Sequence, residues 1–387
     1  MQKEKILVVH NYYQIPGGED TVVANEKKLL EEHGHKVVMY TRHNNEIKNM
    51  TLVQKIWLPF CTIFNFRTYK EVKKIIKEQN IDIVHVHNTL NIISPAVYYA
   101  ARKCKTPVVQ TIHNFRLLCP GATFYRDGHI CEDCVEKGLL CAVMHKCYRE
   151  SRLQTLLCVI STKIHRMLGI YGKINYICLT EFNKNKILKL KKVKNYRVFV
   201  KPNYVESERV VIPYGQREDF FIYVGRLDKL KGIDILFETW KTMKENSPQL
   251  LVAGTGPMEE WCRDYIKVNK LQNITMLGFV HNAEVKELIG KAKGLVLPTR
   301  WYEGFPMTIA EAFSMGTPVL GSNIGNVGGI LSEIDKTLCF VVDDKESIRE
   351  CIKNMKVDAE YIHMFYESNY SSTNNYNELI RIYNSIE

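Results

Sequence analysis

The stretch from 298 to 316, PTRWYEGFPMTIAEAFSMG, is the most informative part of this 387-residue chain. It follows a short apolar run, turns through Glu303-Gly304-Phe305 and enters a helix-length segment. Pro306 stands near the first turn of that segment and Gly316 just beyond its end, the positions that these residues favour in helices. A strand that turns directly into a helix is the building unit of open parallel sheets. We expect this turn to lie at the carboxyl edge of such a sheet, where ligands bind.

The same alternation of apolar runs and helix-length segments extends along the whole chain. In the second half, strands are expected at 220–224, 249–253, 274–277, 294–297, 318–321 and 338–342. The segments between them predict helices at 233–245, 258–269, 283–292, 307–315 and 346–355. The first half opens with strands at 5–10 and 36–40 around a periodic stretch at 19–32, and further strands are expected at 81–86, 107–112 and 174–179. Strands that alternate with helices predict parallel sheets covered on both faces.

Two such sets, with a linker near 201–203, predict an α/β protein of two doubly wound, Rossmann-like domains. We place the first domain at 1–205, with a cysteine-rich insert at 117–148, and the second at 206–370. The remaining residues, 371–387, contain a periodic stretch that predicts a helix.

Composition excludes several classes of protein. Hydrophobic residues make up 45% of the chain and charged residues 25%, which is the globular average and not that of a disordered chain or a coiled coil. No apolar run approaches the ~18 residues that span a bilayer, and no signal peptide opens the chain. The 12 cysteines then favour a reducing compartment. We expect a cytoplasmic protein, peripheral to the inner face of the cell membrane.

The net charge of +11 is unevenly distributed. Residues 1–205 carry 33 Lys and Arg against 16 Asp and Glu, whereas the remainder carries 20 against 26. The first half is therefore expected to meet an anionic partner, although the excess also serves solubility. Residues 51–66, TLVQKIWLPFCTIFNF, are rich in aromatic residues and precede a run of cations. This stretch predicts either a segment lying on an anionic membrane or a core-facing helix broken at Pro59.

The ends of three expected strands carry the residues of a phosphate site. The helix that starts after the turn at Glu303-Gly304-Phe305 offers free backbone amides to an anion. The residues at this helix start are Gly304, Phe305, Pro306, Met307 and Thr308, of which proline has no amide hydrogen. Arg226 and Lys231 follow the first strand of the second domain and can neutralise a diphosphate without a metal.

Tight turns and carboxylates complete this expected site. The turn at Gly254 and Gly256 allows a base or a ribose to approach. Two carboxylates, Glu303 and Glu311, would repel a phosphate, so we expect them to accept hydrogen bonds from sugar and ribose hydroxyls. The alternative for Glu303 is an exposed carboxylate in a capping loop.

Several motifs together resemble the retaining family-4 glycosyltransferases of the GT-B fold, of the type that builds surface polysaccharides and lipid-linked sugars. The matching stretches are GRLDKLKG (225–232), AGTGP (253–257), EGFPMTIAEAFSMGTPV (303–319), NYYQIPGGEDTVV (11–23), EEHGHKVVMYT (31–41), DIVHVHN (82–88) and TIHNFRLLCP (111–120). The resemblance covers nearly the whole chain and implies two domains that face a central cleft. It also implies that the C-terminal helix crosses back to the first domain. The segment 321–328 departs from the Gly-Gly-x-x-Glu turn that is common in the family.

The resemblance implies roles for individual residues. Arg226 and Lys231 would hold the diphosphate of a UDP- or GDP-sugar, Glu311 the ribose and Glu303 the transferred sugar, without a catalytic metal. Gly17 and Gly18 match the glycine loop of the first domain, which closes on the phosphate. His113 matches a histidine near the reacting sugar; its alternative is a hydrogen-bonded core histidine. His85 and His87 alternate on one strand, and without a third ligand they do not make a metal pair.

The insert contains Cys119, Cys131, Cys134 and Cys147, in which the C-x2-C pair has the spacing of a zinc knuckle. A structural zinc on these four thiolates, with Cys141 or His145 as substitutes, competes with free buried thiols. The function expected from the sequence is transfer of a hexosyl unit to a saccharide or polyprenyl-diphosphate-linked acceptor. No nucleic-acid partner is expected. The alternatives are a sugar-nucleotide epimerase of the same architecture and a basic, zinc-containing nucleic-acid-binding module.

Overall fold

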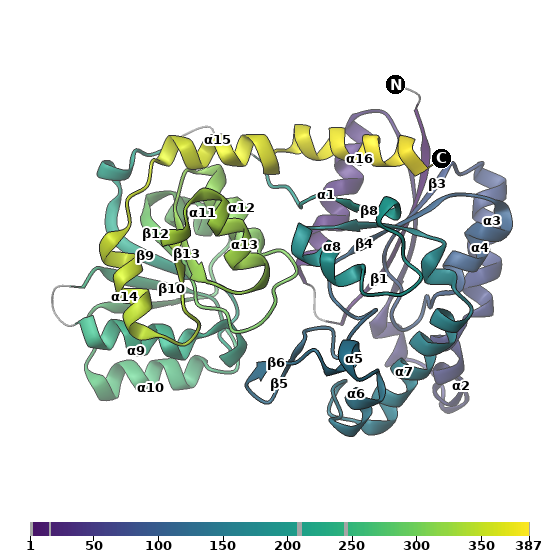
Figure 1. The fold of residues 1–387 in the computed structure, drawn as a ribbon, viewed down its shortest axis with the longest axis horizontal. Coiled ribbons are helices and arrows are strands. Elements are labelled where there is room, and N and C mark those ends of the chain that lie inside the picture. The colour runs from purple at the N-terminus through teal and green to yellow at the C-terminus, as the bar shows by residue number, and fades with distance from the viewer. Residues whose placement is uncertain (1–2, 15–16, 207–210, 244–246, 387) are drawn as a thin grey trace. The chain divides into compact units, whose positions relative to one another are not determined.

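The computed structural model describes residues 3–14, 17–206, 211–243 and 247–386. The chain divides into two compact units (Figure 1). Unit 1 consists of Met1–Arg126, Cys131–Asn203 and Asn375–Glu387, and unit 2 of Asp127–Ile130 and Tyr204–Asn374. Unit 1 therefore includes the end of the chain.

Unit 1 is built on a six-stranded sheet in the order β2-β1-β3-β4-β7-β8. The strands are β1 (Lys5–Tyr12), β2 (Lys36–His43), β3 (Ile83–Asn88), β4 (Val108–Ile112), β7 (Asn175–Cys178) and β8 (Val198–Val200). Every pairing is parallel. The longer helices around the sheet are α1 (Gly18–Glu32), α2 (Leu52–Ile63), α3 (Phe66–Gln79), α4 (Ala96–Cys104) and α7 (Arg152–Met167). All residues of β3, β4 and β7 are buried, as expected for strands covered on both faces.

Unit 2 repeats this plan with a sheet in the order β11-β10-β9-β12-β13-β14, again parallel throughout. Its strands are β9 (Glu218–Val224), β10 (Gln249–Ala253), β11 (Ile274–Gly278), β12 (Ala292–Leu297), β13 (Val319–Ser322) and β14 (Cys339–Phe340). Its helices are α9 (Ile233–Met243), α10 (Glu259–Asn269), α11 (Asn282–Lys291), α12 (Met307–Ser314), α13 (Gly325–Ile334), α14 (Lys345–Asn354) and α15 (Ala359–Tyr370). The predicted class, two doubly wound α/β domains, is confirmed.

The differences from the predicted elements have local causes. Strand β3 continues two residues beyond its predicted end at Val86, because His87 and Asn88 are buried in polar contacts. Helix α13 was not predicted, and its sequence, GNVGGILSEI, contains three glycines, which lower helix propensity. The last two residues of the helix expected at 233–245 lie outside the described residues.

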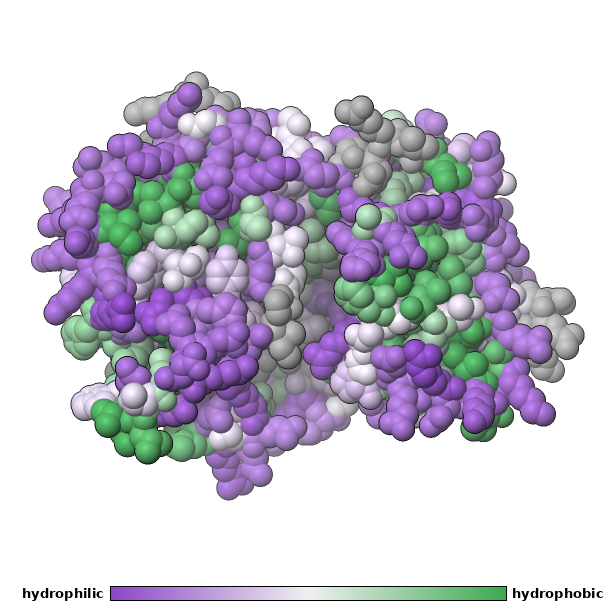
Figure 2. Space-filling view, turned by 180° about the vertical axis from the view of Figure 1, so that it is seen from behind, coloured by the Kyte–Doolittle hydropathy of each residue, from purple (hydrophilic) through white to green (hydrophobic). Residues whose placement is uncertain are grey.

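Helix α2 runs through Pro59 without a break, so the alternative of a core-facing helix broken there is wrong. Five of its apolar side chains are between 59% and 80% exposed: Leu52, Val53, Ile56, Trp57 and Phe60. Figure 2 shows a hydrophobic patch at its lower left, which is where α2 lies when the view of Figure 1 is turned around. Among the described residues, no helix combines the length and the apolar character needed to cross a membrane.

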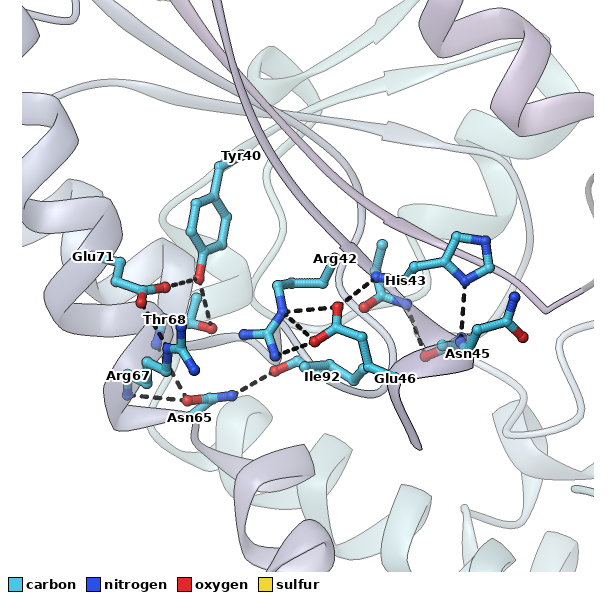
Figure 3. A network of polar contacts seen from close by, with 12 residues as sticks. Tyr40, Arg42, His43, Asn45, Glu46, Asn65, Arg67, Thr68, Glu71 and Ile92 are labelled. Atoms are coloured by element: carbon cyan, nitrogen blue, oxygen red, sulfur yellow. Dashed lines mark hydrogen bonds and ion pairs between the residues drawn. The ribbon is translucent and has the colours of Figure 1, made fainter. Parts of the chain in front are cut away.

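Asn65, two residues after this apolar helix, is fixed by a polar network (Figure 3). Asn65 caps α3 by accepting hydrogen bonds from the amides of Arg67 and Thr68, and its Nδ2 donates to the Ile92 carbonyl at 2.7 Å. Glu71, one turn into α3, accepts from the Tyr40 hydroxyl on β2 at 2.7 Å. The exposed face of α2 is thus joined to a rigidly held start of α3.

Helix α16 (Ser372–Ile386) provides the last element of unit 1. The Tyr376 hydroxyl lies 2.9 Å from His35 Nε2, and the Tyr376 ring stacks on His33 at the end of α1. Tyr383 lies deeper and is fully buried, with its hydroxyl 2.7 Å from His85 Nδ1 on β3. The helix therefore contacts both α1 and the sheet of unit 1.

Candidate functional site

The strand ends of unit 2 bring Lys231 and Glu303 into direct contact. Lys231 ends a short turn after β9, and Glu303 follows β12, the neighbour of β9 in the parallel sheet. Lys231 Nζ lies 2.6 Å from Glu303 Oε1. The sequence assigned these two residues to different parts of one ligand, and the structure places them together as an ion pair.

Within the described residues, the hydrogen bonds to the Glu303 carboxylate all go to one of its two oxygens, Oε1. Its Oε1 also accepts from Thr299 Oγ1 at 3.1 Å and from Trp301 Nε1 at 2.7 Å. The backbone of the same turn is fixed by Asn326 on α13, whose Nδ2 donates to the carbonyls of Glu303 and Gly304 at 2.5 and 2.7 Å. No donor among the described residues reaches Oε2, so this oxygen can accept a hydrogen bond from a ligand hydroxyl. Trp301 and Asn326 were missed at the sequence level.

Arg226 lies on the surface of the same edge. Its side chain is 67% exposed, and its Nε lies 3.1 Å from Asp228 Oδ2. Asp228 also accepts from the Lys231 amide and so caps the turn that carries Lys231. The structure thus holds the backbone of Lys231 in a fixed position and leaves most of the Arg226 side chain exposed to solvent, where an anion can reach it.

The glycines of the expected turn are required by backbone packing. A Cβ at Gly254 would lie 1.9 Å from the Gly225 carbonyl oxygen, and one at Gly256 would lie 2.3 Å from the Leu227 carbonyl oxygen. The loops after β9 and β10 therefore run in contact, and Leu227 N donates to Thr255 O at 2.9 Å. These glycines bring the two loops together whether or not a ligand lies beside them.

Helix α12 begins with Pro306 as its N-cap and Met307 and Thr308 in its first turn. Phe305 is largely buried, and its ring lies 5.5 Å from that of Tyr370. Glu311 lies one turn into the helix and is half-buried, and burial raises the pKa of its carboxyl. The predicted helix start and its carboxylate therefore share one edge of the sheet with Lys231.

In unit 1, His113 follows β4 and lines a cavity of about 80 Å³ together with His87, Thr111, Arg116 and Tyr171. Its Nε2 lies 3.0 Å from His87 Nδ1 on the neighbouring strand. Burial, and next the His87 ring, hold the pKa of His113 well below its usual value. His113 is therefore a neutral imidazole at the wall of a cavity, in contact with a second neutral imidazole, because burial also lowers the pKa of His87 to about 4.

Behind these histidines lies a buried lysine–glutamate pair that was missed at the sequence level. Glu26 Oε2 lies 3.1 Å from Lys201 Nζ, and their side chains are 3% and 2% exposed. Glu26 Oε1 lies 2.9 Å from His85 Nδ1 and 3.3 Å from His87 Nε2. Lys201 Nζ also donates to Asn375 Oδ1 on α16 at 3.0 Å.

One sequence signal pointed to Glu26. On helix α1 it shares a face with Val22, Leu29 and Leu30, all buried, so it stands in the middle of the apolar stripe. Glu26, His85 and His87 place ligand atoms within 4.8 Å of one another, as a metal site would. The Lys201 ammonium already supplies positive charge to this carboxylate, which makes a cation there unnecessary.

The glycine loop before α1 lies beside carboxylates. Gly17 and Gly18 are exposed, and the Gly17 amide donates to Asp20 Oδ2 at 3.0 Å. Asp20 Oδ1 lies 2.7 Å from His10 Nε2. Burial, with Asp20 next, raises the pKa of the neighbouring Glu19 to about 8. An incoming phosphate would therefore meet one amide already bonded to Asp20.

The cysteine insert contains the hairpin β5 (Tyr125–Arg126) and β6 (His129–Ile130) and the short helices α5 (Asp133–Glu136) and α6 (Leu140–Met144). Cys119 accepts a hydrogen bond from the Cys134 thiol, which with backbone amides lowers the pKa of Cys119. Cys131 instead bonds to Asp133, and His145 Nδ1 lies 2.7 Å from Arg126.

Three of the four predicted zinc ligands lie near one another: Cys119 bonds to Cys134, and Cys147 packs against the cluster that contains Cys134. Within the described ranges, the sets of three or more candidate ligand atoms within 4.8 Å of one another contain no cysteine. Zinc stays a prediction, which elemental analysis of the folded protein decides: one equivalent supports it, and none removes it.

Comparison with known proteins identifies the class. Residues 205–372 match the model of the glycosyl transferases group 1, and residues 16–129 match that of glycosyltransferase family 4. The chain is 24% identical over 324 residues to an uncharacterized 42.6 kDa protein in the cps region of Klebsiella pneumoniae, which covers 82% of this chain and 79% of that protein.

Solved structures agree in fold. A glycosyltransferase from Rickettsia africae superimposes with a TM-score of 0.69 at 18% identity, covering 100% of this chain and 99% of that one. Anabaena HepE in complex with UDP-glucose gives a TM-score of 0.64 at 13% identity, covering 99% and 100%. The chain is a family-4-type glycosyltransferase of the GT-B fold. This class fits neither the epimerase nor the nucleic-acid-binding alternative.

Proposed function

We propose that this glycosyltransferase transfers a hexosyl unit from a UDP- or GDP-sugar to a hydroxyl of a saccharide acceptor, with retention of anomeric configuration. The observation that carries the proposal is the Lys231–Glu303 pair at the carboxyl edge of the unit 2 sheet. Lys231 and Arg226 would bind the diphosphate, Glu303 a sugar hydroxyl and Glu311 the ribose. The amides at the start of α12 would complete the anion site.

Retention without a protein nucleophile fits a front-face displacement. The bond from the anomeric carbon to the departing diphosphate breaks, and a bond to the acceptor oxygen forms on the same face. The acceptor proton passes to the departing diphosphate oxygen. The protein then has to stabilise the charge that develops on the diphosphate, which fixed cations and amides do best. Lys231 suits this task because its position is set by Glu303, Asp228 and the turn they hold.

The first test is a thermal-shift series with UDP, GDP, UDP-glucose and a DNA oligonucleotide. We expect one nucleotide diphosphate to raise the melting temperature while the oligonucleotide does not. The sugar nucleotides of the stabilising base are then assayed for transfer, and NMR of the product reports the anomeric configuration. An inverted product would contradict the retaining mechanism, and stabilisation by the oligonucleotide alone would contradict the function.

For the acceptor we propose a lipid-linked, polyprenyl-diphosphate saccharide of cell-surface polysaccharide synthesis, met at an anionic membrane surface. The apolar side chains of α2 are exposed in a row, with Trp57 59% and Phe60 62% exposed. Helix α3 follows at once and carries five cations: Arg67, Lys70, Lys73, Lys74 and Lys77. Apolar side chains next to cations are the combination that binds anionic lipid.

Vesicle flotation tests this membrane proposal. We expect the protein to float with phosphatidylglycerol vesicles and not with phosphatidylcholine vesicles. Trp57→Asp should abolish flotation, whereas Tyr196→Asp, at another exposed aromatic residue of unit 1, should not. Equal flotation of both variants would remove α2 as the contact.

A further inference from the structure

The chain of buried polar contacts from Glu26 to His113 fixes where each proton lies. An ammonium group only donates hydrogen bonds and an ionised carboxylate only accepts them. Lys201 Nζ, at 3.1 Å from Glu26 Oε2, therefore keeps that carboxylate ionised, and Glu26 Oε1 faces His85 Nδ1 and His87 Nε2.

The carboxylate sets the tautomer of His87. His87 Nε2 lies 3.3 Å from Glu26 Oε1 without hydrogen-bond geometry, and a bare Nε2 would set its lone pair against the carboxylate charge. The single hydrogen of the neutral imidazole is therefore placed on Nε2, which leaves Nδ1 bare. His87 Nδ1 lies 3.0 Å from His113 Nε2 and can only accept from it. The proton of neutral His113 is then on Nε2, and the lone pair of His113 Nδ1 is unused by any described residue.

We propose that Glu26 and Lys201 are positioning residues that make His113 a hydrogen-bond acceptor at the wall of the unit 1 cavity. The ligand group that suits this nitrogen is a hydroxyl or an amide N–H, and a carboxylate or a keto oxygen is excluded because neither can donate. The identification of that group as a sugar hydroxyl rests on the proposed function. The tautomer of His113 does not.

The pair Glu26→Gln and Glu26→Gln/Lys201→Met separates this role from a structural one. In Glu26→Gln, Lys201 still requires an acceptor, so the amide turns its oxygen to Lys201 and its NH₂ to the histidines. His87 must then accept at Nε2 and donate from Nδ1, and His113 becomes a donor at Nδ1. Removing the ammonium as well lets the amide turn back, so the double variant should return both histidines to the wild-type tautomer.

Long-range ¹H–¹⁵N NMR of histidine-labelled protein reads these tautomers directly, because protonated and bare ring nitrogens resonate far apart. The His113 signals are assigned by their loss in His113→Gln. We expect a proton on Nε2 in the wild type and in the control Glu32→Gln, on Nδ1 in Glu26→Gln, and on Nε2 again in the double variant. A wild-type His113 that is cationic or protonated at Nδ1 would overturn the proposal, even if Glu26→Gln failed to fold.

Turnover provides the second measurement. With the sugar nucleotide that the transfer assay identifies, Glu26→Gln should lower kcat about tenfold, the loss of one neutral hydrogen bond, and the double variant should recover it. If no sugar nucleotide is turned over, the proposed function fails while the NMR spectra still decide the tautomer. If the tautomers reverse and kcat does not change, His113 does not contact the sugar.

Discussion

A lysine–glutamate pair lies in each unit, and the two pairs differ mainly in burial. Lys201 and Glu26 are 3.1 Å apart with side chains 2% and 3% exposed. Lys231 and Glu303 are 2.6 Å apart but 30% and 11% exposed. A buried pair cannot exchange its partner for a ligand without a large desolvation penalty, whereas a pair at the surface can. The first pair is therefore suited to hold protons in place and the second to meet a substrate.

The largest expected effect is on stability in unit 1. Lys201→Met leaves the Glu26 carboxylate buried without its cation, and breaking such a pair costs about 3–5 kcal/mol. Lys231→Met should cost about 1 kcal/mol or less, because water reaches that pair. Urea unfolding of both variants measures the difference, and equal losses would show that burial does not distinguish the two pairs.

The next effect is on turnover and belongs to unit 2. Lys231→Ala removes a fixed cation from the proposed diphosphate site and should lower kcat about 10²–10³-fold while the fold is kept. Arg226→Ala should act in the same direction. Lys229→Ala, at an exposed lysine of the same turn, is the matched control. Full activity in Lys231→Ala and Arg226→Ala, measured with the same sugar nucleotide, would remove the diphosphate site from this edge.

The sheets were predictable because each strand is an apolar run between helix-length segments, and parallel strands buried on both faces have this signature. The strand ends then placed Lys231 and Glu303 at one edge, since β9 and β12 are neighbours. The contact between the two side chains was not predictable. The sequence analysis assigned both residues to a ligand. The distance between the two side chains shows that, when no ligand is bound, they bond to each other.

The buried pair shows the limit of local reasoning. Glu26 interrupts an apolar stripe, which signals an unusual residue, but its cation, Lys201, stands 175 positions away, directly after β8. Strand β8 itself, VFV, is only three residues long and follows a lysine-rich stretch, so no pattern marked it as the edge strand of the sheet. Long-range polar contacts have no periodicity, and the sequence offers no means of pairing them.

The last expected effect depends on pH and concerns the carboxyl group of Glu19, at the start of α1. Its pKa is raised to about 8 by burial, with Asp20 contributing, against an ordinary value of 4.5. Between these two values the unfolded chain is ionised while the folded chain keeps its proton, so the contribution of Glu19 to stability is lost as the pH rises from about 4.5 to 8.

Glu19→Gln retains the neutral form at every pH. The free energy of unfolding of Glu19→Gln, relative to that of the wild type, should therefore increase as the pH rises from about 4.5 to 8. Above pH 8 the difference between the two should stay constant. Glu32→Gln, at an exposed end of the same helix, should show no such gain. Urea unfolding at a series of pH values measures both differences, and parallel curves for Glu19→Gln and the wild type would mean that Glu19 is ionised in the folded protein.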